Sequence, residues 1–193
     1  NDVLVQKETW EEINLSKLKS WLYNQRIQKI ILSSVTNVEE EVEAYLSTHF
    51  FYIRLTEKTP LPIQNRYESP ETLGKDRLAA IAGAFHLFPN ENCLVIDAGT
   101  CITLDLINAR GAFLGGNISP GIVMRLKAMH EFTAKLPLLQ PHEQADWIGK
   151  TTESAMQNGA QLGAILEIEA FIEKCRSHYN QLNVILTGGD ADF

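Results

Sequence analysis

The feature that most constrains this chain is a run of three short β-type segments near its middle, at residues 94–100, 102–108 and 111–118. Each is rich in apolar and β-branched residues, and short turns that contain glycine connect one segment to the next. Strands joined by such short turns pair with their neighbours as hairpins. A helix-type pattern follows directly, so the segment predicts βββα rather than a purely parallel crossover arrangement.

Hydrophobic spacing predicts alternating helices and strands in the rest of the chain. The expected strands are 3–10, 29–35, 51–55 and 183–187, and the expected helices are 13–26, 37–50, 75–88, 119–132 and 152–179. This order indicates two similar α/β halves, residues 1–90 and 91–193, with mixed sheets flanked by helices. The first half lacks an opening hairpin and the second lacks a closing helix, so we expect the natural protein to extend further at both ends.

Composition narrows the function classes. The formal net charge of −7 disfavours a nucleic-acid surface, which needs clustered Lys and Arg. The sequence shows neither a signal peptide nor an apolar run of membrane-spanning length, so we expect no membrane association and a cytoplasmic protein. The three cysteines have no CxxC or metal-ligand spacing, which indicates reduced thiols rather than disulfides or a zinc site.

The sequence VIDAGT at residues 95–100 is the first candidate site. Asp97 sits where an apolar strand enters a turn with Gly99 and Thr100, so backbone N–H groups and a hydroxyl could face a phosphate while Asp97 holds a cation. Alternatively, these residues only form the hairpin turn. Asp105, on the next strand, alternates with leucines and is interpreted as part of the polar side of the sheet.

Two further glycine-rich segments, GGNISPG at 115–121 and LTGGD at 186–190, follow expected strands. The first places its glycines close to a helix N-terminus, where unpaired amides and the helix dipole favour an anion. Both segments can equally be connections that need a flexible backbone. Together they suggest a nucleotide site.

The segment YESPETLGKDR at residues 67–77 carries a different chemistry. Asp76 lies beside Arg77 in the first turn of an expected helix, where the cation and the dipole keep a carboxylate ionised and ready to accept a proton from an alcohol. Arg77 could instead grip a carboxylate. The alternative is a surface trio of Lys75, Asp76 and Arg77 that decorates a helix start.

Taken together, YESPETLGKDR, IDAGTCITLDLI, GGNISPG, GKTTESAMQNG and LTGGD resemble the type III pantothenate kinase family, in the order typical of that family. The resemblance runs from about residue 33 to residue 190. It implies membership of the acetate and sugar kinase, Hsp70 and actin superfamily, and therefore duplicated halves of the ribonuclease H-like, actin-like ATPase kind.

The resemblance also implies roles for individual residues. Asp76 would be the catalytic proton acceptor, and the pantothenate-binding residues would be Tyr67, Gly74, Lys75, Asp76, Arg77 and, from a neighbouring subunit, Thr152. The ATP-binding residues would be Gly99, Thr100, Gly188 and Gly189. Asp97 would hold a monovalent cation, K⁺ or NH₄⁺, and ATP would be used with Mg²⁺.

The implied reaction is transfer of the ATP γ-phosphoryl group to the primary hydroxyl of pantothenate, giving 4′-phosphopantothenate, the first step of coenzyme A biosynthesis. The family's first hairpin carries a D-x-G-N-[ST] loop that is not found in NDVLVQKETWEE, so we expect the natural protein to begin upstream. The implied assembly is a homodimer with the active site at the subunit interface.

Two other functions are considered. A non-catalytic regulator on the same fold, like relatives of the Bvg accessory factor, would lack the upstream phosphate loop. A Rossmann dinucleotide binder would need a G-x-G-x-x-G after a strand, which this sequence does not contain. Ala155, Gly159 and Gly163 lie four residues apart on an expected helix, a pattern that fits either a dimer seam or packing within one subunit.

Overall fold

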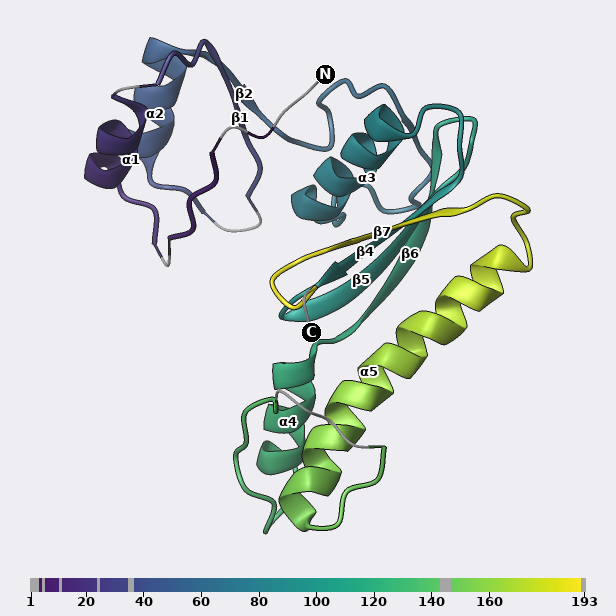
Figure 1. The fold of residues 1–193 in the computed structure, drawn as a ribbon. Helices are drawn as coiled ribbons and strands as arrows, with labels where there is room; N and C mark the ends of the chain where they lie inside the picture. Colours follow the sequence, from purple (N-terminus) through teal and green to yellow (C-terminus); the bar gives the residue numbers. More distant parts are fainter. Residues whose placement is uncertain are drawn as a thin grey trace. The chain divides into compact units, whose positions relative to one another are not determined.

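The computed structural model describes residues 4, 6–10, 12–23, 25–34, 37–142 and 147–191. The chain forms two compact units that divide between residues 59 and 60 (Figure 1). The predicted halves divide between residues 90 and 91 instead. They are predicted as two copies of a repeat, whereas the two units are defined by their compactness. The duplication therefore stays a prediction. None of the described helices is both long enough and apolar enough to cross a membrane.

The first unit packs two helices against a small parallel sheet. Its elements are α1 (Leu15–Leu22), β1 (Lys29–Leu32), α2 (Glu40–His49) and β2 (Phe51–Arg54), with β1 parallel to β2. Each of the four was expected, with shorter bounds here. The expected strand 3–10 is wrong for residues 4 and 6–10, none of which is in a strand. The ring of Trp10 instead meets Trp21 of α1 edge-on, with centroids 5.8 Å apart.

The second unit is built on a five-stranded mixed sheet in the order β3-β6-β5-β4-β7. The pairs β4–β5 and β5–β6 are antiparallel, which confirms the predicted hairpins, while β7 is parallel to β4 and β3 is parallel to β6. The strands are β3 (Gln64–Asn65), β4 (Cys93–Ala98), β5 (Cys101–Ile107), β6 (Ala112–Pro120) and β7 (Asn183–Thr187). The antiparallel centre contradicts a Rossmann sheet.

Three helices cover this sheet, with α3 on one side and the α4–α5 pair on the other (Figure 1). They are α3 (Lys75–Leu87), α4 (Ile122–Glu131) and α5 (Thr152–Arg176). The helix expected from residue 119 begins three residues later, because β6 continues through Pro120 and Gly121 is the N-cap of α4. The observed architecture is therefore a mixed α/β fold with a mixed sheet flanked by helices.

Alternation along the hairpin separates an apolar face from a polar one. Leu94, Ile96, Ile102 and Leu104 are buried in one cluster with residues of α4 and α5. The side chains between them, among them Asp97 and Asp105, therefore point to the opposite face, where α3 packs against β4 and β5. The sheet thus collects acidic groups under α3.

Candidate active site

The first turn of α3 presents Asp76 and Arg77 in different ways. Asp76 is exposed, and its carboxylate accepts a hydrogen bond from the backbone N–H of Arg77 at 2.8 Å. The N-cap of α3, Gly74, has no side chain that could accept a hydrogen bond from the first turn. The Asp76 carboxylate accepts one there instead. An anion in this position is stabilised by the helix dipole. Asp76 is thus held as an accessible carboxylate.

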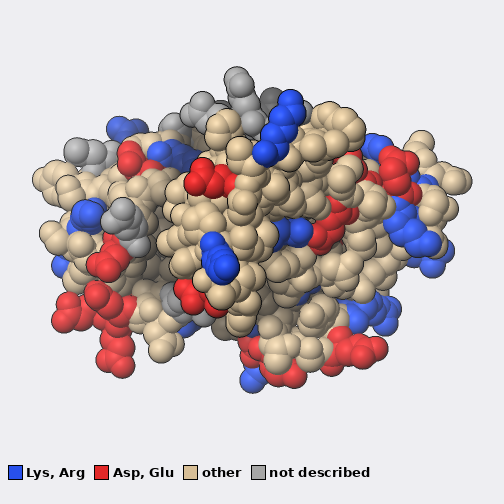
Figure 2. Space-filling view, turned by 90° about the horizontal axis from the view of Figure 1, so that it is seen from below, with Lys and Arg blue, Asp and Glu red and all other residues tan. Residues whose placement is uncertain are grey.

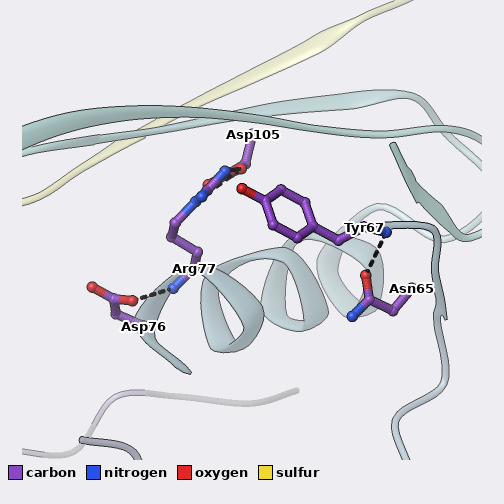
Figure 3. A network of polar contacts seen from close by, with 5 residues as sticks. All are labelled: Asn65, Tyr67, Asp76, Arg77 and Asp105. Carbon is purple, nitrogen blue, oxygen red and sulfur yellow. Dashed lines mark hydrogen bonds and ion pairs between the residues drawn. The ribbon is translucent and has the colours of Figure 1, made fainter. Parts of the chain in front are cut away.

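Arg77 points inward and binds Asp105 of β5 (Figure 3). Its Nε lies 2.9 Å from Oδ2 and 3.2 Å from Oδ1 of Asp105, and its Nη2 lies 2.5 Å from Oδ1. The two side chains are only 6% and 2% exposed. Asp105 does lie on the polar side of the sheet, as interpreted, but α3 covers that side and supplies the arginine. The idea that Arg77 belongs to a surface trio is wrong, because its side chain is buried in this pair.

Hydrogen bonding to Asp105 raises the pKa of Arg77 above its ordinary value, although burial acts in the opposite direction. The charge of Asp105 and the Tyr67 side chain add to the increase. Arg77 is therefore a permanent cation beneath the sheet.

Tyr67 completes the wall beside Arg77. β3 pairs with β6 so that Asn65 lies opposite Phe113, and the Asn65 carboxamide then accepts a hydrogen bond from the Tyr67 N–H at 2.9 Å. This turn brings the tyrosine ring parallel to that of Phe113, with centroids 6.0 Å apart. The guanidinium carbon of Arg77 lies 5.4 Å from the Tyr67 centroid, within cation–π range. A two-residue strand thus positions a half-buried aromatic side chain.

Room for Asp105 depends on Gly116, its partner in the β5–β6 register. A Cβ at residue 116 would lie 2.1 Å from the Leu104 carbonyl oxygen and 2.5 Å from Oδ1 of Asp105. Gly116, in the segment GGNISPG, therefore leaves room for the Asp105 side chain on the polar face of the sheet. Gly115 and Gly116 lie inside β6 rather than at its exit, so the placement expected for these two glycines is wrong, while Gly121 is the N-cap of α4. An anion site at this helix start stays a prediction.

Asp97 shares this corner. On β4 it pairs with Thr103, while Asp105 pairs with Val95, so the two acids are diagonal neighbours on one face, at about 7–8 Å for such positions. Burial raises the pKa of Asp97, and the charges of Asp76 and Asp105 raise it further. The charges of Asp76 and Asp105 therefore both act on Asp97.

A cation at Asp97 stays a prediction: the Arg77 guanidinium binds Asp105, and Asp76 accepts a hydrogen bond from the Arg77 backbone N–H. Burial and two like charges act on Asp97, so a cation beside it would favour its ionised form. The described residues contain no group of three or more His, Cys, Asp and Glu side chains that could hold a metal ion. Hydroxyl, carbonyl or substrate oxygens would have to complete the shell around Asp97.

The turn after Asp97 meets two other segments at the end of the sheet. Gly121 donates its N–H to the Thr100 carbonyl at 3.0 Å, and Asp190 donates to the Ala98 carbonyl at 2.9 Å. Gly188 has φ +105°, and a Cβ there would lie 2.1 Å from the Ala98 oxygen. Only glycine allows β7 to leave the sheet so close to β4.

A hollow of about 330 Å³ opens beside this convergence. Gly99, exposed Thr100 and Asp190 line it together with residues of α4, and Lys127 is the cation among them. An apolar hollow of about 170 Å³, lined in part by Ile165, Ile168 and Leu186, also reaches Asp190. Gly188 and Gly189, which directly precede Asp190 in the sequence, are exposed. The predicted ATP residues thus gather at one end of the sheet.

Thr152 is not part of this group within one chain. It is exposed at the start of α5, after Thr151, whose hydroxyl accepts a hydrogen bond from the Ser154 N–H at 3.1 Å. Figure 1 shows this end of α5 beside α4 and away from α3. Lys75, by contrast, opens α3 beside Asp76 and hydrogen-bonds the Leu73 carbonyl at 3.3 Å.

Comparisons with known proteins identify close relatives. The family model described as type III pantothenate kinase matches residues 5–174. A type III pantothenate kinase of Christiangramia forsetii is 44% identical over 86% of this chain and 68% of its own length. One from Bacteroides fragilis is 43% identical over 92% of this chain and 73% of its own length.

A solved structure has a similar fold. It is that of a conserved Campylobacter jejuni protein, described there as a proposed transcriptional activator of the Baf family. It aligns with a TM-score of 0.53 and 26% identity, covering 90% of this chain and 73% of the other.

Proposed function

This chain belongs to the type III pantothenate kinase family, and we propose that the corner formed by Tyr67, Asp76 and Arg77 is its pantothenate site. The reaction is the ATP-dependent phosphorylation of pantothenate that opens coenzyme A biosynthesis. The observation that carries the assignment is the exposed Asp76 carboxylate next to a buried arginine, with Asp97 and the glycine turns alongside.

In the proposed mechanism, Arg77 and Tyr67 bind and orient pantothenate, with Arg77 as the partner for its carboxylate. Gly74 and Lys75 shape the approach to Asp76. The Asp76 carboxylate accepts the proton of the primary hydroxyl. The hydroxyl oxygen forms a bond to the γ-phosphorus, and the bond between that phosphorus and the oxygen of the leaving ADP breaks. General-base catalysis of this kind contributes about 10² to 10⁴ in rate, and the rest comes from positioning and charge neutralisation.

The nucleotide is proposed to lie along Gly99, Thr100, Gly188 and Gly189. These positions border the hollow at the end of the sheet, where short turns bring backbone N–H groups close together. The kinase family implies ATP with a divalent metal, proposed as Mg²⁺, which would neutralise phosphate charge. A monovalent cation, K⁺ or NH₄⁺, is proposed at Asp97 for the same purpose.

The proposed assembly is a homodimer in which Thr152 reaches the pantothenate of the partner. Two observations support it: Thr152 is exposed and distant from α3, and a groove of about 340 Å³ runs along α5 past Gly159 and Gly163. A Cβ at residue 159 would meet nothing within 4 Å, so that face of the helix is open to a neighbour. A cytoplasmic location is proposed with it.

The units are proposed to be parts of duplicated ribonuclease H-like halves, divided near residues 90 and 91. The parallel pairs β1–β2 and β4–β7, each reached through helices, support this. An experimental structure in which residues 1–90 fail to superpose on 91–193 would refute the duplication.

A non-catalytic regulator is not favoured, because the curated relatives are named as kinases. Mixed charge also argues against nucleic-acid binding: on the face drawn in Figure 2, basic side chains of the described residues are scattered among acidic ones. The deciding assay incubates the intact protein with ATP, Mg²⁺, K⁺ and pantothenate and detects 4′-phosphopantothenate by mass spectrometry. ATP-dependent product is expected, and its absence would refute the function.

A further inference from the structure

We propose that Asp105 is a positioning residue for substrate binding, which selects the edge of Arg77 that pantothenate meets. The inference rests on the proposed pantothenate site. Asp105 does not line the hollow at the nucleotide turns, and it acts through the guanidinium that it holds by Nε and Nη2. This pairing leaves Nη1 as the guanidinium nitrogen that does not face Asp105.

The pair is built to keep one orientation. Asp105 is 2% exposed, and the side-on fork fixes the guanidinium plane, as two parallel N–H···O bonds do. Tyr67 lies against the same group at 5.4 Å, so rotation of the arginine would meet either the ring or the sheet. Gly116 keeps the space that the carboxylate occupies. The surroundings on three sides thus fix the plane of the Arg77 guanidinium.

Another Arg–carboxylate pair of this unit shows the contrast. Arg125 binds Glu167 and so joins α4 to α5, but the side chain of Arg125 is 22% exposed and that of Glu167 is 37% exposed. Arg125 also donates Nε to the Pro120 carbonyl at 2.8 Å, so its orientation does not depend on the carboxylate alone. Glu167→Gln is therefore a matched control, since it makes the same acid-to-amide change in a pair that only supports packing.

The test compares Asp105→Asn with Glu167→Gln in the intact protein. Asp105→Asn keeps the shape but presents an amide N–H₂ or a neutral oxygen to Arg77, so the charge-assisted fork is lost. We expect KM for pantothenate to rise by about tenfold to 100-fold, as for loss of a charged hydrogen bond. KM for ATP should stay within about twofold, because the nucleotide contacts are elsewhere. Glu167→Gln should leave both KM values unchanged.

Equal increases in both KM values, or a loss of thermal stability with unchanged kinetics, would overturn the inference, because either result indicates a structural role. Calorimetric titration with pantothenate alone separates this inference from the proposed function. Wild-type protein that binds pantothenate without phosphorylating it would refute the kinase activity, while about tenfold weaker binding by Asp105→Asn would still support positioning. Wild-type protein that does not bind pantothenate would refute both.

A measurement on the wild type alone covers the case in which Asp105→Asn does not fold. The NMR signal of the Arg77 Nε–H, assigned by its loss in Arg77→Lys, should exchange slowly with solvent and remain so when pantothenate is added. The expected result is a pair that persists in the complex. A signal that exchanges rapidly, or that becomes fast on binding, would show that Asp105 does not hold Arg77 for the substrate.

Discussion

Gly116→Ala tests whether the strand pair beneath α3 has the close approach described above. The new Cβ would lie 2.1 Å from the Leu104 carbonyl oxygen, far inside the 3.4 Å at which ordinary contact begins. A backbone carbonyl in a strand cannot rotate away, so β5 and β6 must separate locally. Overpacking of this kind costs about 1–3 kcal/mol, and the backbone origin of the clash favours the upper part of that range.

The assay is thermal and urea unfolding of the wild type and of two alanine variants. A loss of about 2–3 kcal/mol corresponds to about 4–12 °C in Tm for a protein of this size. Gly83→Ala is the matched control: Gly83 is exposed inside α3, and a Cβ there meets nothing within 4 Å. Alanine should stabilise that helix by about 0.5–1 kcal/mol. Equal stability of the two variants would refute the packing argument at Gly116.

Three further outcomes follow from the geometry. Gly188→Ala should raise KM for ATP more than KM for pantothenate, because a side chain at φ +105° displaces the β7 turn from Ala98; equal KM changes would contradict this. Glu167 has a pKa lowered below its ordinary value of 4.5: burial opposes the shift, but the hydrogen bond from Arg125 and the positive charge of Arg125 outweigh it. Its contribution, less than about 1 kcal/mol for a partly exposed pair, should be present above pH 4.5 and disappear as pH falls further, so wild type and Glu167→Gln should converge in acid-unfolding curves. Gly159→Leu should weaken the proposed dimer in sedimentation, and an unchanged dimer would remove α5 from the interface.

The local pattern was sufficient for most elements of the fold. Short glycine turns predicted the hairpins of β4 to β6, and helical spacing predicted α3 and α5. The two residues of β3 carry no periodic signal, since their pairing depends on β6 far along the chain. Pro120 was expected to open a helix, but it closes a strand, which an edge-facing proline permits.

The candidate site was predictable only in part. The residue types and order of the segment 67–77 identified Asp76 and Arg77, but alternation alone placed Asp105 on a polar face without showing what covers it. The partner comes from a helix 28 positions away in the sequence, a contact that no local period reports. The one local signal was the glycine at residue 116, whose missing side chain leaves space for a buried acid.

Asp76→Asn tests the central claim most directly. The substitution keeps the size of the side chain and the hydrogen bond to the Arg77 N–H while removing the proton acceptor. The intact variant should bind ATP and pantothenate with affinities close to those of the wild type, and its kcat should fall by about 10² to 10⁴. A kcat equal to that of the wild type would show that Asp76 takes no part in proton transfer.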